Sequence, residues 1–129
     1  MSHRLKTFAV LVFLSFGLQA KSIHYTLSMP EPHTHLLEVE MRLEGSKGTE
    51  VVAMPVWTPG SYLIREYAKN VQDISAQSED GSELKIQKTD KNHWEIKGKG
   101  GQDIIISYKV YAYEHSVRTS YLNSDHALI

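Results

Sequence analysis

Cysteine is absent from this 129-residue sequence. Its absence excludes disulfide bonds, thiolate metal sites, cysteine nucleophiles and lipid anchoring through an N-terminal cysteine. The sequence also lacks the H-E-x-x-H, G-x-S-x-G, P-loop and glycine-rich dinucleotide-binding motifs. We therefore assign no catalytic residue, no metal ligand and no cofactor to this chain, and we expect the chain alone to be inactive.

An excess of positive charge is missing as well. Once residues 1–20 are set aside, for the reason given below, 12 basic residues stand against 15 acidic ones. This mildly acidic balance argues against binding to nucleic acid or to an anionic membrane surface. We therefore expect no nucleic-acid partner.

The first twenty residues differ in character from the rest of the chain. Two basic residues precede an apolar run at residues 8–18, and the small residue Ala20 follows at a plausible cleavage site. This is the pattern of a secretory signal peptide, and the run is shorter than the roughly 20 residues that span a membrane. An uncleaved anchor or a buried helix is the alternative. We expect a cleaved chain, residues 21–129, in the periplasm or outside the cell and free of the membrane.

Apolar and polar residues alternate through much of the remaining chain. The alternation is clearest in two stretches, whose apolar members are Ile23, Tyr25, Leu27 and Met29 in the first and Leu37, Val39, Met41 and Leu43 in the second. A period of two places one set of side chains on a buried face of a β-strand and the other set in water. We therefore expect the apolar members of both stretches to be buried.

Five further strands are expected, at residues 51–57, 71–76, 84–88, 93–97 and 104–113. The last run is the most apolar, and its β-branched and aromatic content predicts a central strand covered on both faces. Short strands at regular spacing, separated by turn residues, are typical of an antiparallel sandwich or barrel. We predict an all-β domain, an antiparallel β-sandwich, over residues 21–129.

Residues 54–67 are denser in unusual residues than a plain sandwich needs. They include Trp57, Tyr62 and Arg65, and the pair Pro59-Gly60 predicts a type II turn. One interpretation is a structured loop that presents aromatic and guanidinium groups to a neighbouring domain or peptide. The other is a corner whose Trp57 and Tyr62 plug the core. The sequence does not decide between them.

Residues 113–126 form a second unusual segment, which turns polar after the most apolar run. One interpretation is a frayed extension. His115 and His126 flank the polar stretch and could line a cleft, although ordinary surface histidines are favoured. Elsewhere, His33 and His35 are two residues apart, so on one strand they would share a face that a metal ion could bridge. No carboxylate accompanies them at a convincing spacing, which favours two solvated loop histidines.

Both unusual segments resemble a known family. Residues 55–62, P-V-W-T-P-G-S-Y, and their continuation through residues 64–67, I-R-E-Y, resemble the signature of the N-terminal domain of the PDZ-containing glycyl aminopeptidases, metallopeptidase family M61. Trp94, residues 108–112 and residues 116–122 follow in the expected order. The resemblance covers residues 22–129.

The resemblance implies an enzyme of three parts: an N-terminal β-sandwich, a thermolysin-like zinc domain with H-E-x-x-H, and a PDZ domain. Such enzymes remove N-terminal residues, preferentially glycine, from peptides. The implied partner is the catalytic domain of the same longer polypeptide, which would hold the zinc ion and contact the peptide substrate. We expect Arg65, Tyr67 and Arg118 to make polar contacts to that domain or to the peptide.

Two other functions stay open. A stand-alone secreted module that binds peptide or carbohydrate would use exposed aromatic side chains such as Trp57 and Tyr62. A small hydrolase with an unfamiliar site is disfavoured, because the sequence has no nucleophile–base or metal motif. The apolar ending at residues 127–129 favours truncation of a longer reading frame over a genuine short protein.

Overall fold

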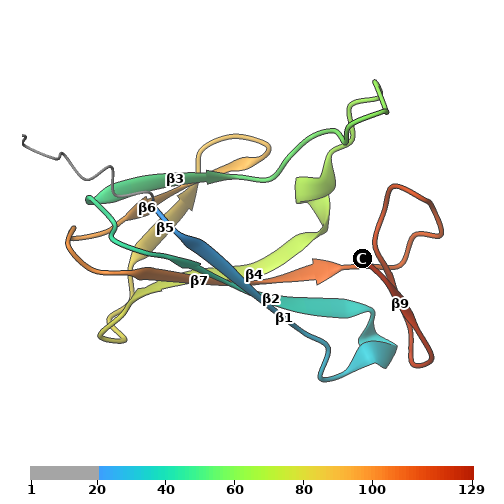
Figure 1. The fold of residues 1–129 in the computed structure, drawn as a ribbon, viewed down its shortest axis with the longest axis horizontal. Coiled ribbons are helices and arrows are strands. Elements are labelled where there is room, and N and C mark those ends of the chain that lie inside the picture. Colours follow the sequence, from blue (N-terminus) through green and yellow to red (C-terminus); the bar gives the residue numbers. More distant parts are fainter. Residues whose placement is uncertain (1–20) are drawn as a thin grey trace, which may run out of the picture.

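The computed structural model describes residues 21–129, so the expected signal peptide at residues 1–20 lies outside the described part. Within it the chain forms nine strands and two short 3₁₀ helices (Figure 1). These are β1 Ile23–Ser28, η1 Pro32–Thr34, β2 Leu36–Leu43, β3 Thr49–Ala53, η2 Tyr67–Asn70, β4 Val71–Ser78, β5 Lys85–Lys88, β6 His93–Lys97, β7 Ile104–Tyr111, β8 Tyr121–Leu122 and β9 Ala127–Leu128. No helix in residues 21–129 has the length and apolarity to cross a membrane.

All strand pairs are antiparallel, which confirms the prediction of an all-β, antiparallel chain. The strands form a four-stranded sheet in the order β1-β2-β7-β4, a three-stranded sheet in the order β3-β6-β5, and the small hairpin β8-β9. In Figure 1 the three-stranded sheet lies above the four-stranded one, and β8-β9 stands at one end of both.

The two larger sheets share one core. In the four-stranded sheet, Met41 of β2 lies opposite Ile106 of β7, and Leu43 lies opposite Ile104. These four side chains are buried in the same cluster as Ile96, which comes from β6 of the other sheet. The alternation predicted for residues 37–43 is therefore confirmed, because every second residue of β2 is buried. Met41 and Leu43 lie in this core, and Leu37 lies in a second, smaller cluster with Ala112 and Leu122.

The burial predicted for the first strand is wrong. The side chains of Ile23, Tyr25, Leu27 and Met29 are between 39% and 58% exposed. The first three lie opposite Leu43, Met41 and Val39, so they do continue the inner face of the sheet. They stay exposed because the opposing three-stranded sheet does not extend over β1, whose contacts are chiefly with β2.

Strand β7 is central in its sheet, as predicted, but it is not covered on both faces. Ile104 and Ile106 are buried, whereas Ile105 and Lys109 on the opposite face are only half-buried. Lys109 lies 3.6 Å from a carboxylate oxygen of Asp73 on the neighbouring strand β4. The outer face of the four-stranded sheet therefore carries polar residues, and β7 buries only its inner face, with Ile104 and Ile106 in one cluster and Val110 against a second.

Candidate functional site

Residues 54–67 follow the end of β3 and form an ordered loop. The type II turn predicted at its centre is confirmed, because Gly60 has φ +83° and the Ser61 N–H donates to the Thr58 carbonyl at 3.1 Å. Past this turn the chain presents its large apolar side chains to solvent. Trp57 is 53% exposed, and the next three are more so, namely Tyr62, Leu63 and Ile64.

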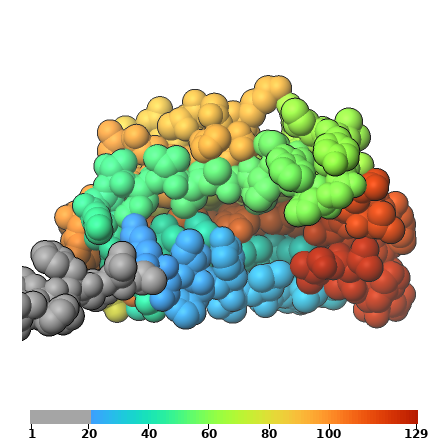
Figure 2. Space-filling view, turned by 45° about the horizontal axis from the view of Figure 1, so that its top comes forward, coloured from blue at the N-terminus to red at the C-terminus, as the bar shows by residue number. Residues whose placement is uncertain are grey.

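These side chains settle the question that the sequence left open. Tyr62 is fully exposed, and Trp57 contributes to neither core cluster of the described residues, so the interpretation of a corner that plugs the core is wrong. Figure 2 shows this part of the chain protruding at one end of the molecule, above the C-terminal segment. We call Trp57, Tyr62, Leu63 and Ile64 the apolar loop.

The base of the loop is fastened to the rest of the molecule. The Met54 backbone N–H donates to the Asn92 backbone carbonyl, and the Asn92 side-chain amide donates to the Met54 backbone carbonyl, both at 2.9 Å. Further along, a Glu66 carboxylate oxygen lies 2.6 Å from the Lys91 ammonium. The hydrogen bond to Lys91 and the charge of Lys91 lower the pKa of the Glu66 carboxyl below its ordinary value. The same hydrogen bond and the charge of Glu66 raise the pKa of Lys91.

The loop is also joined to the C-terminal segment, residues 113–126. The Tyr67 hydroxyl donates to the Arg118 carbonyl at 3.1 Å, and the Lys69 ammonium lies 3.3 Å from Glu114. The structure thus brings two of the three predicted contact residues, Tyr67 and Arg118, together. Their contact uses the Arg118 backbone, and the Arg118 side chain is exposed.

Arg65, the third predicted residue, lies in the same stretch of chain. Its N–H donates to the Val56 carbonyl at 2.6 Å, which closes the loop on itself. A concavity of about 320 Å³ is lined by residues 63–67, Lys69, Asn70 and Glu114. The Arg65 Nε atom is buried and finds no hydrogen-bond acceptor among residues 21–129. A buried donor without an acceptor costs about 1–3 kcal/mol.

The C-terminal segment is folded, although no pattern in the sequence favours this over a frayed extension. Its centre is Tyr121, a buried side chain on β8 whose ring stacks on Tyr113 at 5.5 Å and on His115 at 3.8 Å. His126 lies on the same ring at 5.3 Å. Both histidines are exposed, as the favoured interpretation expects, and both pack on one tyrosine. The interpretation of a frayed extension is wrong.

The pair His33 and His35 does not share a strand face. His33 lies in η1, and His35 caps that turn in the left-handed conformation, with φ +63°. The His35 Nδ1 atom lies 2.6 Å from the Leu122 carbonyl, and its ring stacks on Tyr113 at 3.9 Å. His35 thereby holds the C-terminal segment in place. Within residues 21–129 no three His, Cys, Asp or Glu side chains gather in a way that would hold a metal ion.

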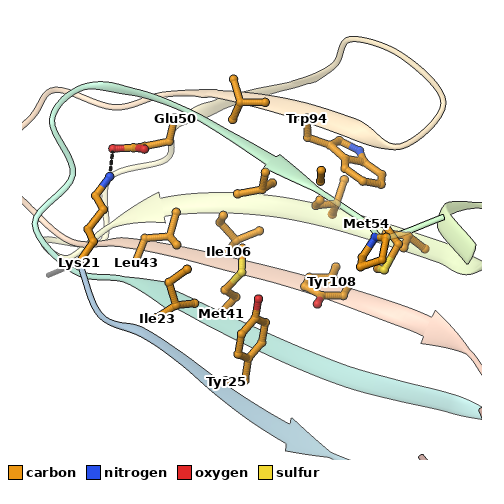
Figure 3. A pocket seen from close by; sticks show the side chains of 16 residues that line it. Lys21, Ile23, Tyr25, Met41, Leu43, Glu50, Met54, Trp94, Ile106 and Tyr108 are labelled. Carbon is orange, nitrogen blue, oxygen red and sulfur yellow. Dashed lines mark hydrogen bonds and ion pairs between the residues drawn. The ribbon is translucent and has the colours of Figure 1, made fainter. Parts of the chain in front are cut away.

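A second hollow lies between the two larger sheets (Figure 3). It has a volume of about 490 Å³ and is lined mainly by apolar side chains from both sheets, among them Tyr25, Met41, Trp94 and Ile106. Lys21 and Glu50 form an ion pair at one end. The hollow exists because β1 is uncovered. Sequence reasoning missed it, since the alternation in residues 23–29 predicts a buried face without showing which strand covers it.

The chain is thus an all-β domain that exposes the apolar loop at one end of the molecule. Residues 24–129 match the Peptidase M61 N-terminal domain, and the chain belongs to this family. The resemblance inferred from residues 55–67 is thus confirmed.

One solved structure is similar in both fold and sequence. It is an aminopeptidase N family protein from Idiomarina loihiensis, with 31% identity and a TM-score of 0.72. The match covers 79% of this chain and 17% of that one, so the chain spans less than a fifth of that protein's length. No curated protein was found to match.

Proposed function

We propose that this chain is the non-catalytic N-terminal β-sandwich domain of a zinc-dependent glycyl aminopeptidase, and that it supports the catalytic domain of the same longer polypeptide. Membership of the M61 N-terminal family supports this role. So does the length of the structural neighbour, of which the chain matches 17%. In this proposal the signal peptide directs the protein to the periplasm or outside the cell.

The observation that carries the proposal is the anchored apolar loop. Four large side chains are held in solvent by a backbone that is tied at both ends, through Asn92 and through Tyr67. Leaving such a patch in water is unfavourable, and contiguous apolar patches on soluble proteins mark interaction sites. Aromatic anchors beside an arginine are the composition that protein interfaces favour. The catalytic domain is the partner that the family would supply.

The concavity beside Arg65 gives this contact a polar component. A carboxylate or carbonyl of the catalytic domain would accept from the accessible part of the Arg65 guanidinium, since Arg65 is only half-buried. In that position, against the catalytic domain, the loop would form part of the wall of the peptide cleft. The described residues offer no donor set for zinc. We therefore assign the zinc ion to the catalytic domain and derive no zinc-dependent step for this chain.

The first test is the size of the native protein. An antibody to this domain captures the product from an extracellular or periplasmic extract, and its intact mass is measured. We expect a species several-fold heavier than the 14.7 kDa of this chain. A species lighter than 14.7 kDa by the mass of residues 1–20 would contradict the proposal and favour a stand-alone module.

The second test changes the loop in that longer polypeptide. Serine at Tyr62, Leu63 and Ile64 should weaken the contact between domains, lower the melting temperature and reduce peptide turnover. Val51→Ser is the matched control, because Val51 is exposed to the same 61% as Leu63 but lies on β3. Alanine at Arg65, Tyr67 and Arg118 should act in the same direction. Unchanged domain association and turnover in all of these variants would contradict the proposed role of the loop.

A stand-alone secreted module is the second candidate, and the exposure of Trp57 and Tyr62 favours it. Flat aromatic faces in solvent suit stacking on sugar rings or on peptide side chains. For this candidate, Trp57→Ala should abolish retention on a peptide or carbohydrate array while the melting temperature stays the same. Binding that survives both Trp57→Ala and Tyr62→Ala would rule it out.

A further inference from the structure

Each of the two larger sheets has two edge strands, and three of these four edges carry protection. Edge strands are normally shielded by charges, proline or bulges, because their free N–H and C=O groups can pair with another chain. Strand β5 carries Lys85 and Lys88, and β4 is bulged next to Asp73, which has φ +51°. Strand β3 carries Glu50. Strand β1 has no acidic residue, lysine, arginine, proline or bulge between Ile23 and Ser28.

The free backbone groups of β1 belong to its apolar residues. The Glu44 N–H donates to the Ser22 carbonyl at 3.1 Å, so Ser22 faces β2. Backbone direction alternates along an antiparallel strand, and therefore Ser22, His24, Thr26 and Ser28 direct their N–H and C=O groups to β2. Ile23, Tyr25 and Leu27 direct theirs away from the sheet. The side chains of these three residues also form the exposed inner face.

We propose that β1 is an interaction surface for a second copy of this chain, and that the two β1 strands pair antiparallel across a two-fold axis. This pairing gives a partner to every free backbone group of β1. It joins the two four-stranded sheets into one sheet of eight strands. Because the axis is perpendicular to that sheet, the two apolar hollows lie on the same side, and the exposed halves of the inner faces become continuous.

The side chains select the register. Residues that lie opposite each other must share a face, so the two-fold axis passes beside a single residue and not between two. With the axis at Thr26, Ile23 lies opposite Met29 of the partner subunit and Tyr25 lies opposite Leu27 of the partner subunit. This register pairs the four exposed apolar residues with one another, whereas Lys21 keeps its ion pair with Glu50 of its own chain. An axis at Tyr25 would place Lys21 opposite an apolar methionine, so the Thr26 register is the complementary one.

Cysteine crosslinking tests this register on the full chain, which has no cysteine of its own. Thr26 would face Thr26 of the partner subunit in a non-hydrogen-bonded pair, where Cα atoms are about 4.5 Å apart, within the range that a disulfide spans. We expect the Thr26→Cys chain to form a disulfide-linked dimer under mild oxidation. His24→Cys is the control, because two His24 residues would lie roughly 13 Å apart in this register. Equal crosslinking of both variants, or of neither, would overturn the proposal.

A backbone substitution tests the edge independently of oxidation. Tyr25→Pro removes an N–H that points away from β2, so the ladder to β2 stays intact, and proline is tolerated at such edge positions. Tyr25→Ala loses the same side chain but keeps the N–H. We expect a dimeric mass by light scattering for the unchanged chain and for Tyr25→Ala, and a monomeric mass for Tyr25→Pro. Intact mass records whether residues 1–20 are retained, and circular dichroism confirms the fold.

A monomer in the unchanged chain, or a Tyr25→Pro dimer as stable as the Tyr25→Ala dimer, would overturn the proposal. These outcomes leave the proposed function untouched, because that function rests on the loop at residues 54–67 and is tested there. The two proposals can therefore fail separately.

Discussion

At the scale of single residues, the exposed pair Glu66–Lys91 makes a prediction about pH. Lys91 holds the pKa of the Glu66 carboxyl below its ordinary value through a 2.6 Å hydrogen bond. Because the folded pKa is the lower one, the pair stabilises the loop above the ordinary carboxylate pKa, and this stabilisation is lost as the pH falls through the folded pKa. Lys91→Met should raise the pKa of Glu66 toward its ordinary value in an NMR titration. Lys85→Met, on the edge strand β5, should leave it unchanged.

The Tyr67 hydroxyl makes a second prediction at this scale. It is the donor that connects the loop to the Arg118 carbonyl. Tyr67→Phe removes the hydrogen bond and keeps the ring, so the free energy of unfolding should fall by about 0.5–1 kcal/mol. Amide exchange around residues 113–122 should accelerate in parallel. Tyr62→Phe is the control, since Tyr62 is fully exposed. Faster exchange in both variants would show that Tyr67 does not hold the segment.

At the scale of elements, most strands could be predicted from the sequence. How far the opposing sheet covers each strand could not. The period-two pattern located β2 and gave the correct buried face, because one face of β2 packs on the core and the other lies toward solvent. The same pattern in β1 failed on burial, since a single sequence does not show how far the opposing sheet extends. The short strands β8 and β9 were missed because two adjacent buried residues, Tyr121 and Leu122, in a polar stretch give no periodic signal.

The candidate site likewise could be predicted in part from the sequence and in part only from the fold. The density of Trp, Pro, Gly, Tyr and Arg in residues 54–67 was enough to single out the loop and to predict its turn. The sequence does not show whether Trp57 faces the core or the solvent, because the hydrogen bonds that fasten the base of the loop join Met54 to Asn92, which is distant in sequence. Lys91 and Glu114 were missed as partners of the loop. They are ordinary charged residues in sequence, and only the fold brings them near it.

The turn at Gly60 gives a prediction for the loop as an element. Gly60 has φ +83°, and an added Cβ would meet no atom within 4 Å, so a substitution is strained by its backbone alone. Gly60→Ala should lower the free energy of unfolding by about 1 kcal/mol. Gly60→Asn should cost less, because asparagine tolerates the left-handed region better. Urea denaturation measures both, and equal losses would show that the left-handed conformation is not the cause.

At the scale of the whole molecule, the shared core predicts that both sheets unfold together. Ile96 of β6 and Ile106 of β7 are completely buried in one cluster, although they belong to different sheets. Replacing either with alanine should cost about 2–5 kcal/mol, a large share of the 5–15 kcal/mol that stabilises a typical domain. Val51→Ala, on an exposed position of β3, should cost less than about 0.5 kcal/mol.

The double variant decides whether the sheets are one cooperative unit. If Ile96 and Ile106 support each other across the core, the combined loss of stability should differ from the sum of the single losses by at least about 0.5 kcal/mol. Fluorescence of Trp94, which is buried on β6, follows the three-stranded sheet, and far-ultraviolet circular dichroism follows the strands of both sheets. Both signals should change at the same urea concentration. Two separate transitions, with additive losses, would mean that β3-β6-β5 folds apart from the larger sheet and that the hollow between them is no fixed feature.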